Sequence, residues 1–232
     1  MSNEWIWFLF ALTNFALMTA AYKLFGKTGL IVWIATGTVL ANIQVLKLVE
    51  LFGLTATLGN ITFGSIFLAT DTLSEKYGLK VARRSVFIGF FTLLSALIIM
   101  QFAVWFQPAE GDEAHDALAF LFAFNFQDFS FLRVALASLT AYLISQLLDV
   151  HLFQKIRQRF PGQRRLYIRN IGSTAVSQLV DSLIFVPIAF LGVLETPILI
   201  DIILTTYLIK LIVALIDTPF VYAMTRIKPI DL

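Results

Sequence analysis

The sequence predicts an all-α fold, a polytopic membrane helix bundle of about seven transmembrane helices in a single integral membrane domain, residues 1–232. Hydrophobic residues make up 59% of the chain and charged residues only 14%, a balance that soluble domains of this length do not show. Apolar runs of bilayer-spanning length recur along the chain, and basic residues gather in alternate loops. These three observations leave no room for a separate soluble domain.

Seven apolar runs have the length of a membrane-spanning helix. The first is expected to be a retained helix, because its opening residues include Glu4 and no basic residue, unlike a signal peptide. The third is the most polar, with Asn60, Gly64 and Asp71, so a broken or re-entrant segment is the alternative to a full span. The runs cover about residues 5–25, 30–50, 55–75, 85–106, 131–153, 169–191 and 198–224.

Loop charge predicts the orientation of these helices. The loops 76–84 and 155–169 are rich in Lys and Arg, whereas the loop 107–130 contains acidic residues and no basic ones. Basic loops remain in the cytoplasm, so seven spans place the N-terminus outside and the C-terminus inside. In this orientation 14 of the 17 basic residues face the cytoplasm, and the exceptions are Lys47, Arg133 and Lys210.

Composition and motifs exclude several classes of function. A net charge of only +2 disfavours a nucleic-acid partner. The absence of cysteine excludes disulfides, thiol nucleophiles and thiolate metal sites. No hydrolase, metalloprotease or phosphate-binding motif is present, so we expect no enzyme, no cofactor, no metal and no ATPase within the chain. Transport by such a chain is passive, ion-coupled or driven by partner subunits.

Eight charged residues lie inside or at the ends of the apolar runs. A charge at the centre of a bilayer costs at least about 2.5 kcal/mol, so this many predict a polar pathway or binding cavity between helices. They are Lys47, Glu50, Asp71, Asp149, Asp181, Asp201, Lys210 and Asp217.

The predicted sixth helix carries a polar stripe. Asn170, Thr174, Ser177 and Asp181 recur at spacings of four, three and four, which places them on one face. Helix–helix hydrogen bonding is the alternative interpretation for Thr174 and Ser177. Lys210 on the seventh helix lies at about the depth of Asp181, so we expect the two to face each other across the cavity. A purely structural ion pair is the alternative.

The predicted fifth helix repeats this spacing with Ser138, Tyr142, Ser145 and Asp149, and Gln146 flanks the same face. Asp149 lies near the basic loop, so pairing with Arg157 is an alternative to a role in binding.

Polar residues also mark the predicted second and third helices. Asn60 and Asp71 share one stripe of the third helix. On the second, Lys47 and Glu50 are three residues apart and can pair. Asn42 lies deeper, so its amide needs a partner.

Two strings carry a resemblance to a known family. One is Gly64-Ser-Ile-Phe-Leu-Ala-Thr-Asp71, followed by Ser74-Glu-Lys-Tyr-Gly78 and Ala82-Arg-Arg84. The other is Ser145-Gln-Leu-Leu-Asp-Val-His-Leu-Phe153, followed by Arg157, Asn170 and the Ser177, Asp181, Ser182 group. Over about residues 36–225 the chain resembles the putative vitamin uptake transporter family, also called queuosine precursor transporters.

The resemblance implies an inner-membrane importer of 7-cyano-7-deazaguanine or 7-aminomethyl-7-deazaguanine, the precursors of queuosine in tRNA. It implies a six-helix core at about 30–225, similar to the substrate-binding subunits of energy-coupling factor transporters, with 5–25 as an extra helix. Two alternatives stay open: a substrate-binding membrane subunit of an ATP-driven complex, and an importer of another purine-like or vitamin-like solute.

The chemistry of a deazaguanine suggests roles for the polar residues. A carboxylate, Asp181 or Asp149, would accept from the ring N–H and exocyclic amine. Gln146, Asn60 or Asn170 would donate to the carbonyl, and an aromatic ring, Tyr142, would lie beneath the base. The candidate substrate-binding residues are Asn42, Asn60, Asp71, Tyr142, Gln146, Asp149, Asn170, Ser177, Asp181 and Lys210.

Further partners are left open by the sequence. Apolar surroundings favour the protonated form of a carboxylic acid, so protons are a candidate coupling ion, through Asp181 or Asp71. The lipid bilayer is the expected environment, and a homo-oligomer is compatible with the sequence.

Overall fold

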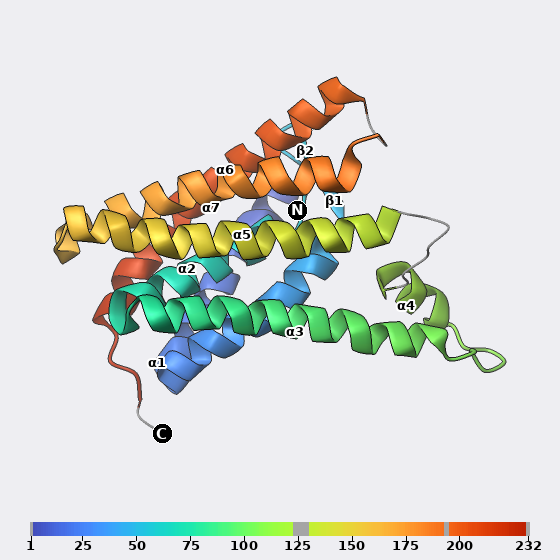
Figure 1. The fold of residues 1–232 in the computed structure, drawn as a ribbon, viewed down its shortest axis with the longest axis horizontal. Helices are drawn as coiled ribbons and strands as arrows, with labels where there is room; N and C mark the ends of the chain where they lie inside the picture. Colours follow the sequence, from blue (N-terminus) through green and yellow to red (C-terminus); the bar gives the residue numbers. More distant parts are fainter. Residues whose placement is uncertain (1, 123–129, 193–194, 231–232) are drawn as a thin grey trace.

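The computed structural model describes residues 2–122, 130–192 and 195–230, and most of them lie in long helices packed side by side (Figure 1). The predicted class, a polytopic membrane helix bundle, is confirmed. The described elements are α1 (Asn3–Gln44), β1 (Leu48–Leu51), β2 (Leu54–Thr57), α2 (Asn60–Tyr77), α3 (Leu79–Trp105), α4 (Ala114–Phe122), α5 (Ser130–Arg159), the 3-10 turn η1 (Gln163–Arg165), α6 (Leu166–Phe190) and α7 (Thr196–Arg226).

Helix α1 contains 42 residues and is two helices joined at a sharp bend. Gly26 has φ 56° and ψ −137° there, a conformation that residues with a Cβ rarely adopt. The N-terminal half returns to the strands that follow the second half, because Asn3 Nδ2 donates to the carbonyl of Glu50 at 3.1 Å. The two halves are therefore antiparallel, as the predicted helices 5–25 and 30–50 require.

A β-hairpin replaces the adjoining ends of two predicted helices. The predictions 30–50 and 55–75 are wrong for residues 45–50 and 55–59, because the helix ends at Gln44 and α2 begins only at Asn60. Strands β1 and β2 pair antiparallel, with Leu51 opposite Leu54. The turn residues Phe52 and Gly53 both have positive φ, 54° and 73°, as tight hairpin turns require. The hairpin marks one end of the bundle, called here the hairpin end.

The chain terminus marks the opposite end, called here the C-terminal end. The amide of Ile230 donates to the carbonyl of Lys23 at 2.8 Å, and Lys76 Nζ donates to the carbonyl of Ile227 at 2.7 Å. The bend of α1 and the end of α2 therefore lie beside the C-terminus. The two halves of α1 and helices α2, α3, α5, α6 and α7 give seven segments running between the two ends.

Helix α2 is continuous over its 18 residues, so the alternative of a broken segment does not hold. It contacts α1, α3, α5 and α7, and every residue from Asn60 to Ser74 except Phe63 is buried. Five other described helices, α1, α3, α5, α6 and α7, are long and apolar enough to cross a membrane. A polar helix is tolerated at the centre because its neighbours shield it from lipid.

The acidic region 107–130, expected to be a loop, contains the short helix α4 over Ala114–Phe122. Phe122 of α4 is buried against Leu93 and Leu97 of α3, so burial of apolar residues explains this helix. Residues 123–129 of the predicted loop lie outside the described residues.

Gly29 makes the reversal of α1 possible, and its substitution tests the bend. A Cβ at Gly29 would overlap the backbone carbonyl of Ala21. Gly29→Ala should therefore destabilise the protein by about 1–3 kcal/mol, the usual cost of overpacking, seen as a lower melting temperature in detergent. Gly172→Ala is the matched control, since its Cβ would meet only Ile156 Cδ1 at 3.4 Å. Equal melting temperatures for both variants would contradict this account of the bend.

Candidate functional site

Buried polar side chains on α2, α5, α6 and α7 form three successive layers between the hairpin end and the C-terminal end. Helical spacing dictates this order, because each layer lies one to three turns from the next along the same helices. We call them the Asp181–Lys210 site, the inner carboxyl cluster (Asp71, Asp149, Asp217) and the Glu75–Arg169 cluster.

The predicted pair of Asp181 and Lys210 is present. Lys210 Nζ forms an ion pair with Asp181 Oδ2, and Ser145 Oγ donates to Asp181 Oδ1 at 2.9 Å. The Lys210 and Asp181 side chains are only 6% and 15% exposed. Counting residues along two antiparallel helices was therefore enough to place these charges opposite each other.

A narrow cavity of about 20 Å³ lies beside this pair, which is room for about one water molecule. Asn60, the first residue of α2, lines it together with Thr206 of α7. Two aromatic rings, Phe63 and Phe185, also line it. The polar stripes did not predict either ring. Phe63 lies three residues after Asn60, and Phe185 lies four residues after Asp181, so each ring shares a helix face with a predicted site residue.

Asn42 lies next to this cavity on the second half of α1. Its Nδ2 donates to the carbonyl of Thr38 at 2.8 Å, and its Oδ1 accepts from Ser138, which lines the cavity. Both polar atoms of the Asn42 amide thus have hydrogen-bond partners, as expected from the sequence.

Deeper in the bundle, the inner carboxyl cluster gathers three aspartates from three helices. Asp71 of α2, Asp149 of α5 and Asp217 of α7 are each no more than 2% exposed. Asp71 and Asp149 are neighbours in this layer. Ser177 Oγ donates to Asp149 Oδ1 at 2.9 Å, and Asn170 Nδ2 donates to Asp217 Oδ1 at 3.1 Å.

Four of the predicted substrate-binding residues therefore lie in this second layer, and none of them lines the cavity beside Asp181. They are Asp71, Asp149, Asn170 and Ser177. Gln146 belongs to the same depth, because its Oε1 accepts from Thr70 Oγ1 at 3.2 Å.

Tyr142 is directed away from both layers. Its hydroxyl donates to the carbonyl of Val86 on α3 at 3.3 Å and lies against Gly89 of α3. The cavity beside Asp181 is lined without it. The spacing with Ser138 and Ser145 could not reveal this, because periodicity does not say which neighbouring helix a long side chain meets.

The third layer closes the bundle towards the C-terminal end. The guanidinium of Arg169, 1% exposed, donates to both carboxylate oxygens of Glu75 at 2.9 and 2.7 Å. Arg157 lies 3.6 Å from the same carboxylate and donates to the carbonyl of Ser74 at 3.2 Å. The alternative pairing of Asp149 with Arg157 is thus not observed. The sequence patterns did not single out Glu75 and Arg169 as site residues, although Glu75 lies within the string that follows Asp71.

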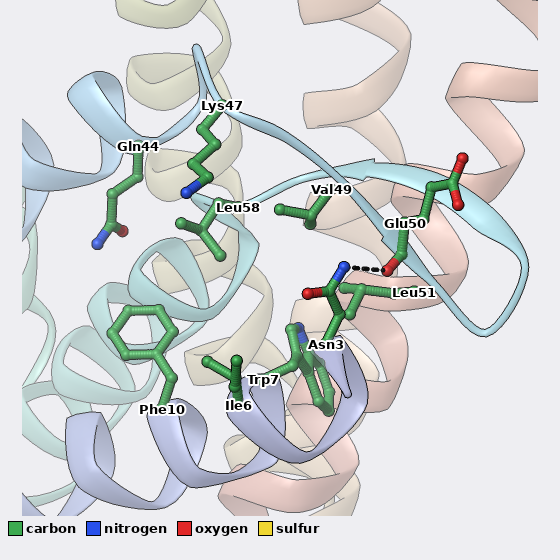
Figure 2. A pocket seen from close by; sticks show the side chains of 10 residues that line it. All are labelled: Asn3, Ile6, Trp7, Phe10, Gln44, Lys47, Val49, Glu50, Leu51 and Leu58. Carbon is green, nitrogen blue, oxygen red and sulfur yellow. Dashed lines mark hydrogen bonds between the residues drawn. The ribbon is translucent and has the colours of Figure 1, made fainter. Parts of the chain in front are cut away.

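A larger cavity, about 690 Å³, opens at the hairpin end (Figure 2). Residues of the first turns of α1, including Trp7 and Phe10, form one wall, and Gln44, Lys47 and Leu58 form another. Figure 2 shows Lys47 and Glu50 pointing in different directions. The predicted Lys47–Glu50 pair is wrong, because no such ion pair occurs in the described parts of the chain and the hairpin separates the side chains.

No metal site is apparent in the part of the chain that the structure describes, where no three His, Asp or Glu residues are grouped to hold an ion.

Comparison with known proteins identifies the family. A family model described as "Putative vitamin uptake transporter" matches residues 57–224. The chain belongs to this family. The match begins at the end of the hairpin and includes all three polar layers.

Two curated proteins show the extent of the similarity. The chain is 49% identical over 231 residues to a "Probable queuosine precursor transporter" of Bacillus subtilis (strain 168), covering 100% of this chain and 98% of that protein. It is 33% identical over 142 residues to a "Queuosine precursor transporter" of Escherichia coli (strain K12), covering 61% of this chain and 58% of that protein. No solved structure matches this chain.

The Asp181–Lys210 pair predicts a specific pattern of stabilities. Lys210→Met leaves a buried carboxylate without its cation, a loss of about 3–5 kcal/mol, so the melting temperature in detergent should fall strongly. Asp181→Asn combined with Lys210→Met removes both charges and should recover most of that loss. If the double variant melted as low as Lys210→Met alone, the two charges would not be coupled as the structure implies.

Proposed function

We propose that this chain imports a queuosine precursor, 7-cyano- or 7-aminomethyl-7-deazaguanine, across the inner membrane and acts as a transporter rather than an enzyme. The observation that carries the proposal is full-length similarity, at 49% identity, to a protein named as a queuosine precursor transporter. The polar layers within a membrane bundle supply the chemistry that such a solute needs.

The Asp181–Lys210 site has the groups to bind a deazaguanine. The carboxylate of Asp181 would accept from the ring N–H and the exocyclic amine, and Asn60 or Lys210 would donate to the carbonyl oxygen. Phe63 and Phe185 line the same cavity, so one of them, rather than Tyr142, would stack on the flat base. The base would take over hydrogen bonds that Asp181 now makes with Lys210 and Ser145.

The present cavity is too small for a base, so binding requires the helices to separate. The outer cavity of about 690 Å³ is large enough, and the segments 44–47 and 57–60 contribute to both cavities. We therefore place entry at the hairpin end, with these two segments moving as the base passes inward.

Release requires the opposite end to open. The ion pairs of Glu75 with Arg169 and Arg157 lie between the inner layers and the C-terminal end. These bonds would break in the inward-open state, while the hairpin end closes, as alternating access demands. The hairpin end would be external and the C-terminal end cytoplasmic, in agreement with the basic loops at 76–84 and 155–169.

Uptake in cells that cannot make queuosine precursors tests the proposal. Expression of this chain, with either deazaguanine supplied at low concentration, should restore queuosine in tRNA. Asp181→Asn should reduce that restoration at least tenfold, since an amide replaces one acceptor with a donor, whereas the exposed Asp201→Asn should behave like wild type. Restoration only when an ATPase and a coupling subunit are added would favour the subunit alternative. No restoration despite membrane expression would contradict the proposed substrate.

The closed C-terminal end can be tested with cysteines, because the chain has none of its own. Gln154 Nε2 donates to Ser74 Oγ at 2.7 Å, so the two side chains meet across α2 and α5. A short bifunctional methanethiosulfonate should therefore join Ser74→Cys to Gln154→Cys through bonds that a reductant breaks. Uptake should stop on cross-linking and return on reduction, while each single variant should keep its uptake after the same treatment. Undiminished uptake with the cross-link formed would show that these helices need not separate.

A further inference from the structure

The inner carboxyl cluster has three acids and no available cation in the described part of the chain. Each nearby cation is already engaged: Lys210 with Asp181, Arg169 and Arg157 with Glu75, and Lys76 with the carbonyls of Met224 and Ile227. Three uncompensated negative charges in a membrane interior are prohibitively costly. Some other positive species must therefore neutralise the cluster.

The remaining titratable groups on the surrounding helices do not supply it. From α1, Tyr22 lies against Tyr77 at the C-terminal end, with an oxygen–oxygen distance of 3.4 Å. The basic residues of α3, Lys80, Arg83 and Arg84, are exposed. Glu75 and Asp181 flank the cluster from either side along α2 and α6 and already hold the cations named above.

The hydrogen bonding of the cluster indicates which species is missing. Four fully buried oxygens there accept no hydrogen bond: both of Asp71, Oδ2 of Asp149 and Oδ1 of Asn170. Asn170 carries no charge, is 1% exposed, and its Nδ2 donates to Asp217. Its unpaired Oδ1 is therefore evidence for a missing donor that does not depend on the charge of the three acids. One buried donor at this depth, Gln146 Nε2, also has no partner, so four unpaired acceptor atoms are present for one unpaired donor atom. A protonated carboxyl group is a further donor. Neighbouring carboxyl groups, such as those of Asp71 and Asp149, can share such a proton.

Each carboxylate without a cation needs one proton to become neutral, so we propose that protons neutralise the inner carboxyl cluster and that one of them, held by the Asp71–Asp149 pair, is the proton whose inward movement drives uptake. The inference rests on the proposed function for the identity of the solute, but the proton site is defined by the chain alone. A proton enters from the external side, converts a carboxylate to a carboxylic acid, and leaves to the cytoplasm when the Glu75–Arg169 cluster opens.

The two inner layers are close enough to be coupled. Ser145, which donates to Asp181, lies one helical turn before Asp149, and Ser177, which donates to Asp149, lies one turn before Asp181. A shift of α5 against α6 that changes one set of hydrogen bonds must therefore change the other. Substrate at Asp181 and a proton at Asp149 can stabilise the same arrangement of these helices.

Transport by purified protein in liposomes tests the coupling. Wild type should concentrate the deazaguanine about tenfold for each pH unit of an inward proton gradient, the limit for one proton per solute, and a protonophore should abolish this. Asp149→Asn and Asp71→Asn, which mimic the neutral acid, should still exchange labelled for unlabelled solute but should not concentrate it. Asp201→Asn, exposed on α7, should behave like wild type.

The outcomes separate this inference from the proposed function. Exchange by wild type without any response to the proton gradient, or accumulation that follows a sodium gradient instead, would overturn the proton site and leave the solute assignment standing. If wild type exchanges no deazaguanine, the proposed function fails, and infrared spectroscopy still decides the proton site. A carboxylic-acid carbonyl band at neutral pH, weaker in Asp149→Asn but unchanged in Asp201→Asn, is the expected result. Absence of that band in folded wild type would overturn the inference.

Discussion

The constraint on which this structure depends is the neutralisation of charge in an apolar environment. The chain places four aspartates and one lysine in the interior of the bundle, where each unpaired charge would cost several kcal/mol. Asp181 is neutralised by Lys210, Asp149 accepts from the hydroxyl of Ser177, and Asp217 accepts from the amide of Asn170. The close packing of α5 on α6 and of α2 among its neighbours follows from the need to keep these groups together and away from lipid.

In the proposed mechanism, the three polar layers have different roles along one axis of the bundle. Nearest the hairpin end is a charged pair with two aromatic rings, which suits recognition of a flat base. In the middle is a set of acids without cations, which suits exchange of a small positive species. Nearest the C-terminal end are ion pairs of arginine and glutamate, which suit a barrier that opens as a unit. Short helical spacings connect each layer to the next, so none of them can rearrange alone.

Periodicity and residue counting predicted much of this arrangement. The seven segments follow from the lengths of the apolar runs, and the antiparallel directions of α6 and α7 follow from the alternation of loop charge. The pairing of Asp181 with Lys210 follows from a fixed rise of 1.5 Å per residue. Two features could not be predicted in this way. The hairpin over Leu48–Thr57 continues the apolar character of the adjacent helices, so hydropathy did not separate it. Tyr142 shares a stripe with Ser145 and Asp149 but reaches α3 instead, because Gly89 leaves room for its hydroxyl. The pairing of helices, unlike their periodicity, depends on such long-range packing.

The outer cavity has an unusual origin in the sequence. Much of its wall comes from Ile6, Trp7, Phe10 and the strand β1, all of which precede residue 57, where the family model begins to match. The family model thus leaves most of this wall unmatched, although the Bacillus subtilis protein is similar to the chain over the wall as well. In the proposed mechanism, a family member with a different leading segment would keep the same three polar layers behind a differently shaped outer cavity. Selection among external solutes would then depend partly on residues before position 57.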